Sequence, residues 1–188
     1  GHSALAAVTS GSGNLAIGYN SLLACTTSSN NLAIGVNAMV TQVRLDTKNI
    51  AIGNYSMDNC TENAYNVAIG YNALTAMTAG NTGSIKATYN TAVGYLAGDA
   101  LTGGYSAGGG DPADRGMHNT FIGAATDASA VTGNNQTVVG YGTTGVADNS
   151  VTLGNASVTA TYLASDSQAL VHSAGIQFAG TQVANALS

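Results

Sequence analysis

The fold of this chain is decided by residues 66–74, which read Asn66-Val67-Ala68-Ile69-Gly70-Tyr71-Asn72-Ala73-Leu74. The first five residues, or close variants of them, recur eight times along the 188 residues. Successive repeat glycines are 17, 18, 17, 24, 29, 17 and 14 residues apart. Internal repeats of this length indicate a stack of similar units in which each unit contacts its neighbours. The repeat glycines are Gly18, Gly35, Gly53, Gly70, Gly94, Gly123, Gly140 and Gly154.

Each copy has the pattern of a short strand that ends in a turn. Alternate residues share a face of a strand, so Val67 and Ile69 are expected to face the core while Ala68 faces the other way. A residue as small as Ala68 suggests that another backbone or another subunit approaches on that second face. Gly70 is expected to take the turn, and Leu74 to point inward from a second, return strand. One such unit buries too little to fold alone, so stacking must close the core.

The predicted fold is all-β, a parallel β-solenoid (β-roll) of about eight coils. Period-2 alternation, β-branched residues and frequent glycine all disfavour helix. The Asn that precedes most copies is expected to form a ladder of stacked amides that satisfies turn backbone groups. Residues 1–13 form a lead-in, of which 1–3 are typical of a tag remnant. The solenoid spans residues 14–155, with inserts near 78–89 and 99–118, and residues 156–188 form a short β-rich trimerisation segment.

The composition excludes several functional classes. Charged residues make up 7 % of the chain, its formal net charge is −5, and it has four Lys and Arg in total. A nucleic-acid binder needs a basic stripe that neutralises phosphates, and none is present. No apolar run approaches the roughly 20 residues that cross a bilayer, so membrane insertion is not expected. So little charge also argues against a freely soluble monomer.

The cysteines and histidines do not form a recognisable metal or redox motif. Cys25 and Cys60 occupy the same repeat position two coils apart, about 9–10 Å of rise, whereas a disulfide needs Cα atoms about 4.4–6.8 Å apart. We expect both to be buried free thiols. His2, His118 and His172 are far apart in sequence and lack neighbouring ligands at metal-binding spacing. No metal and no cofactor is predicted.

The second insert is the candidate receptor-binding segment. Solenoid inserts collect on one face, which is often the binding face, and loops longer than about 12–15 residues are uncommon without a role. A tolerated acidic surface loop is the alternative, because long loops cost little closure entropy. Asp111 and Asp114 are also a conceivable cation site or acid–base pair, but glycine-rich flanks do not fix two carboxylates as glycoside hydrolysis requires. No enzyme activity is therefore predicted. The candidates are Tyr105, Asp111, Asp114, Arg115 and His118.

Tyrosines form a second candidate surface. Four of them directly follow a repeat glycine and are expected to line one edge of the solenoid, with Tyr55 one position further on. Exposed rings among Asn and Thr donors suit stacking against sugars. The alternative is that the rings pack a turn or a seam between subunits. The four residues of this edge are Tyr19, Tyr71, Tyr95 and Tyr141.

These motifs resemble those of two related groups. The Asn-x-Ala-Ile-Gly copies, their Gly-Tyr-Asn-Ala-Leu continuation and residues 149–155, Asn-Ser-Val-Thr-Leu-Gly-Asn, are similar to phage tail fibres and tail spikes with a C-terminal self-cleaving intramolecular chaperone. They are also similar to the head β-roll of trimeric autotransporter adhesins. The resemblance covers about residues 14–163. It implies a homotrimer on a virion tail fibre, outside the cell, that attaches to a host cell-surface receptor, glycan or protein.

The 17-residue spacing and the inserts favour the phage group over the shorter, more uniform autotransporter repeats. In that group the chaperone is released by a cut after a Ser, which fits an end at Ser188. An end chosen for expression explains Ser188 equally. Two alternatives stay open: an adhesin head on a bacterial cell surface, and a glycan-degrading spike with its site between subunits.

Overall fold

The computed structural model describes residues 1–41, 48–60, 63–77, 87–102 and 116–161. Contacts divide the chain into two units, Gly1–Ser157 and Val158–Ser188. The first unit holds all the strands described below. In the predicted C-terminal segment, residues 156–161 include no strand. The rest of that segment, Ser188 included, lies outside the described residues.

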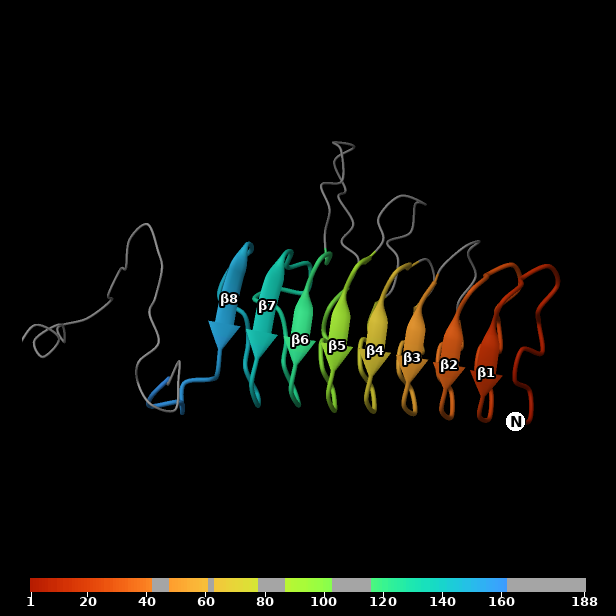
Figure 1. Cartoon of the computed structure of the whole chain (residues 1–188), viewed down its shortest axis with the longest axis horizontal. Helices are drawn as coiled ribbons and strands as arrows, with labels where there is room; N and C mark the ends of the chain where they lie inside the picture. The colour runs from red at the N-terminus through yellow and green to blue at the C-terminus, as the bar shows by residue number, and fades with distance from the viewer. Residues whose placement is uncertain (42–47, 61–62, 78–86, 103–115, 162–188) are drawn as a thin grey trace, which may run out of the picture. The chain divides into compact units, whose positions relative to one another are not determined.

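The first unit is a parallel β-solenoid, as predicted (Figure 1). Its strands form one sheet in chain order, and each strand pairs in parallel with the next. Within the described residues there is no helix. Every strand falls on a predicted repeat unit: β1 Leu15–Ile17, β2 Leu32–Ile34, β3 Ile50–Ile52, β4 Val67–Ile69, β5 Thr91–Val93, β6 Thr120–Ile122, β7 Gln136–Val139 and β8 Ser150–Leu153.

The prediction of a return strand is wrong. The described strands all belong to the one sheet, and the residues that follow each repeat glycine form turns. Leu74 does point inward, with no exposed surface, but its φ is +52°. Leu22, Met39 and Met57 hold the same position in earlier coils and have φ between 49° and 55°. A strand needs negative φ, so this left-handed residue bends the chain instead of extending it.

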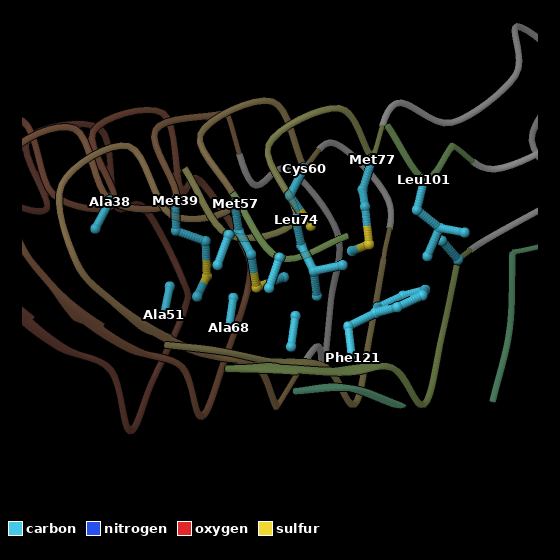
Figure 2. Packing of buried hydrophobic residues seen from close by; sticks show 14 of the residues in the cluster. Ala38, Met39, Ala51, Met57, Cys60, Ala68, Leu74, Met77, Leu101 and Phe121 are labelled. Atoms are coloured by element: carbon cyan, nitrogen blue, oxygen red, sulfur yellow. The ribbon is translucent and has the colours of Figure 1, made fainter. Parts of the chain in front are cut away.

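The two faces of each strand are also the reverse of the prediction. Ala68 is completely buried, whereas Ile69 is 37 % exposed and Ile17 is 52 % exposed. The Ala side chains point into the coil toward the long Leu and Met side chains from the opposite side (Figure 2). Those long side chains fill the narrow interior and leave room for little more than a methyl group on the strand. The flanking Leu, Ile and Val residues therefore face outward.

One coil exchanges large and small residues without changing its total bulk. Phe121 stands in β6 where earlier strands have Ala, and it is completely buried. Gly98 stands where earlier coils have Leu or Met. A Cβ at Gly98 would lie 2.8 Å from both Leu74 Cδ2 and Phe121 Cδ2, so the ring occupies the missing side chain's space. Interiors packed this closely accept such paired changes better than single ones.

The predicted amide ladder is confirmed. The Asn49 backbone N–H donates to Asn31 Oδ1 (3.0 Å), the Asn66 N–H donates to Asn49 Oδ1 (2.9 Å), and the Asn90 N–H donates to Asn66 Oδ1 (2.9 Å). The ladder begins at Asn14 and continues through Asn119 to Gln136. Each side chain thus ties one coil to the next at the start of a strand.

The same amides also close the coils across the long gaps. Asn66 Nδ2 donates to the Ala87 carbonyl (3.0 Å), and Asn90 Nδ2 donates to the Gly116 carbonyl (2.8 Å). Register is unaffected by the longer spacing, since Val67 pairs with Thr91 and Thr91 with Thr120.

Candidate binding surface on the turns of the coils

The tyrosines that follow the repeat glycines are all exposed, as an accessible edge requires. The structure stacks Tyr71 on Tyr95, with centroids 5.7 Å apart and planes 17° apart. Tyr19 stacks on His2, which sequence reasoning set aside as a tag residue, at 5.6 Å. Tyr141 is 77 % exposed, and among the described residues no ring contacts it. The predicted edge therefore exists in pieces, of which the Tyr71–Tyr95 pair is the most ordered.

A hollow of about 410 Å³ adjoins this pair. Tyr55 meets Tyr71 there with centroids 5.7 Å apart and planes 67° apart. Burial raises the pKa of the Asp58 carboxyl above its usual value, and backbone N–H groups of Asn59 and Asp58 partly oppose that shift. Sequence reasoning noted Tyr55 but missed the hollow. Its lining is Tyr55, Asp58, Asn59, Tyr71, Asn72, Thr75 and Ala76.

A second aromatic row, absent from the sequence predictions, lies at the start of the strands. Tyr65 stacks on Tyr89 (5.0 Å, 6°), and Tyr89 stacks on His118 (5.3 Å, 2°). Lys48 Nζ lies 5.3 Å from the centroid of the Tyr65 ring. Each of these residues directly precedes a ladder Asn, and that position was the available signal. His118, predicted as part of the second insert, belongs to this row; Tyr105, Asp111, Asp114 and Arg115 lie outside the described residues.

A carboxyl pair stands at the base of the second insert. Burial raises the pKa of Asp127 to about 7, and the charge and hydrogen bond of the neighbouring Asp99 raise it further. The Ala100 backbone N–H, 3.3 Å from Asp127 Oδ1, favours the ionised form but does not offset these effects. Asp127 therefore holds a proton in the folded chain at a pH where an unfolded Asp is ionised.

This pair makes stability depend on pH. Because the folded-state pKa of Asp127 is about 7 and its model value is 3.8, the folded chain binds the extra proton between these values. Stability should therefore fall as pH rises from 4 to 7 and stay low above 7. We expect Asp127→Asn, neutral throughout, to exceed the wild type by about 1 kcal/mol at pH 8, after allowance for partial exposure. Urea unfolding at pH 4 and pH 8 measures this, and an equal difference at both pH values would contradict it.

The cysteines are structural. Cys25 and Cys60 are free and completely buried, which confirms the prediction. Burial raises the pKa of the Cys60 thiol to about 12, and Asn63 Nδ2 lies 3.4 Å from its sulfur. A thiol held protonated in this way is neither a nucleophile nor a metal ligand.

The described part of the chain brings no three His, Cys, Asp or Glu side chains together as a metal site. It also includes no helix with the length and apolar character needed to cross a membrane. What the surface offers is aromatic rings, amides, hydroxyls and a few carboxyls, which is the chemistry of recognition. No protein-family model, curated protein or solved structure matches this chain.

Proposed function

We propose that this chain is a structural and receptor-binding segment of a homotrimeric bacteriophage tail fibre, with about eight coils per chain, that attaches to the host cell surface without catalysis. The observation that carries the proposal is the uncovered apolar face of the sheet. A released C-terminal chaperone would act during maturation, as the resemblance implies.

The uncovered face is made by the outward side chains of the strands. They flank the buried central residue of each strand, so they fall on one side of a continuous sheet. Single exposed apolar residues are normal, but contiguous apolar patches beyond a few hundred Å² usually mark an interface. The exposed members are Leu15, Ile17, Ile69, Val93, Ile122, Val151 and Leu153.

A second copy of the chain is the natural occupant of this face. The face carries no charged residue in β1 to β8, so it offers nothing to select a charged partner. Identical copies present identical apolar columns, and burial stabilises them by about 25 cal/mol for each Å² removed from water. The resemblance to trimeric fibres selects three copies. A trimeric adhesin head would use the same face, but the uneven spacing of the repeats favours the fibre.

Attachment is supported by what remains exposed. The tyrosine edge, the second aromatic row and the segment 103–115 lie away from the strand positions that form the apolar face. Aromatic rings with neighbouring amides and hydroxyls can bind glycans or proteins. A trimer presents each such site three times, which raises avidity for a repetitive cell surface.

The assembly is tested by a charge in the apolar face. We expect the wild type to sediment at three times the chain mass of 18.5 kDa, and Ile69→Asp to sediment at that mass. The substitution would bury three unpaired carboxylates, each at a cost of several kcal/mol. Val36→Asp is the matched control, because Val36 is also 37 % exposed but lies outside the strands; it should remain trimeric. A monomeric wild type would rule out the trimer.

The same variants test attachment. Fluorescently labelled wild type and Val36→Asp should bind intact cells of at least one strain in a bacterial panel, and monomeric Ile69→Asp should bind them at least about tenfold less through lost avidity. A trimeric wild type that binds none of the cells would contradict receptor binding and leave a purely structural role.

A further inference from the structure

The hollow beside Tyr71 has an angled aromatic wall. Tyr71 and Tyr95 stack almost in parallel, at 17°, but Tyr55 meets Tyr71 at 67°. The regular stacking therefore stops at the hollow, and two rings meet there at a steep angle. Such a corner offers ring surface to the C–H face of a sugar, which is apolar, while sugar hydroxyls point away from it.

Polar groups lie beside this wall. Thr75 Oγ1 donates to the Asn72 carbonyl (3.2 Å), which leaves its lone pairs free as acceptors. Within the described residues, the side-chain amides of Asn59 and Asn72 make no hydrogen bond. The Asp58 carboxyl is partly buried at the same place. Donors and acceptors next to apolar rings match the mixed surface of a sugar ring.

The solenoid itself does not require these residues. Asp58 lies five positions after its repeat glycine, where the two preceding coils have Leu23 and Val40. Tyr55 lies two positions after the glycine, where the first two coils have Asn20 and Asn37. The hollow thus appears where the repeat departs from its own pattern, and a departure without a packing need calls for another explanation.

The charge of the lining limits the ligand. Asp58 is the only ionisable acid or base among the lining residues other than the two tyrosines, and no cation lines the hollow. An anionic sugar would meet a carboxylate with no compensating Lys or Arg, which costs binding energy in a partly desolvated site. An uncharged sugar meets acceptors that its hydroxyls can satisfy.

We propose that the hollow binds an uncharged hexose unit of a cell-surface glycan, held against Tyr55 and Tyr71 and hydrogen-bonded by Asp58, Asn59 and Thr75. The inference rests on the proposed attachment function, for which it names the chemistry of the receptor. It places the binding on the turn that follows β3 and the turn that follows β4.

Saturation-transfer NMR on the intact assembly tests the proposal. The probes are the methyl glycosides of glucose, galactose and mannose, with methyl glucuronide as the acidic comparison. We expect at least one neutral glycoside to bind with a Kd of about 1 mM, as suits a ligand of this size. Methyl glucuronide should bind at least about tenfold more weakly, because its carboxylate faces Asp58.

Three variants locate the binding. Tyr71→Ala should weaken the neutral glycoside about tenfold; other coils carry Val36, Asn54 or Ala124 at this position, so the fold accepts the change. Asp58→Asn should narrow the difference between the neutral and the acidic probe. Tyr89→Ala is the matched control, since Tyr89 is an exposed, stacked tyrosine of the other row, and it should bind as the wild type does.

The proposal is overturned if no neutral glycoside shows saturation transfer, or if Tyr71→Ala binds as well as the wild type. Cell binding separates it from the proposed function. If Tyr71→Ala loses the sugar but attaches to cells like the wild type, attachment stands and the hollow is not its receptor site. If the wild type binds the sugar but no cell, the hollow stands and the attachment function fails.

Discussion

Gly70→Ala is expected to prevent the middle of the solenoid from folding. The φ of Gly70 is +141°, in a region that residues with a side chain rarely adopt, and a Cβ there would lie 2.1 Å from the Gly94 carbonyl oxygen. That oxygen belongs to the next coil, so relief requires the two coils to separate along the sheet. Strain at such a φ costs about 1–3 kcal/mol, and the backbone clash should bring the loss to at least about 4 kcal/mol.

Urea unfolding followed by circular dichroism measures this loss. Gly142→Ala is the control, because Gly142 also has positive φ (+55°) but its Cβ would meet nothing closer than Asn155 Nδ2 at 3.9 Å. It should cost about 1 kcal/mol, the value for strain without a clash. Equal costs for the two variants would show that the close approach of the coils at Gly70 is not real.

Asn66→Ala should have the second largest effect. Asn66 is completely buried, and its Oδ1 accepts from both the backbone N–H and the Nδ2 of Asn90, at 2.9 and 3.2 Å. Its Nδ2 donates to the Ala87 carbonyl at 3.0 Å. Removal leaves the Asn90 N–H and the Ala87 carbonyl unpaired inside the coil. At about 1–3 kcal/mol for each buried group, we expect a total loss of about 4 kcal/mol.

Thermal and urea unfolding of the same variant give the measurement. Asn54→Ala provides the comparison: the exposed Asn54 accepts a hydrogen bond through Oδ1 from the Val36 N–H (2.8 Å), and its loss should cost about 1 kcal/mol. An Asn66→Ala protein no less stable than Asn54→Ala would mean that the ladder does not hold the coils together.

The repeat made the positions of the strands, the ladder and the cysteine column predictable, because each depends on local sequence and on stacking in register. The orientation of the strands was not predictable in the same way. In Val67-Ala68-Ile69 both faces are apolar, so alternation separates two faces without saying which is inside. The width of the interior decides, and that width depends on Leu74 reaching across from a left-handed turn.

The candidate site divides along the same line. Tyr71 and Tyr95 could be placed on one edge by counting from the repeat glycines. The hollow could not, because it depends on the 67° angle between Tyr55 and Tyr71 and on the side-by-side placement of Asp58 and Thr75 from different coils. Tyr65, Tyr89 and His118 were missed because they align with the ladder Asn and not with the glycines.

The amide clamps at Ala87 and Gly116 separate the length of the chain from the geometry of the sheet. Repeat spacings of 24 and 29 residues leave the strand pairs in the same register as spacings of 17. At the longer gap the two ends meet, since a Cβ on Gly116 would lie 2.5 Å from the Thr102 carbonyl oxygen. These two positions are therefore natural grafting points: a lineage, or a protein engineer, can exchange whole peptides there and change what the molecule recognises while its scaffold stays constant.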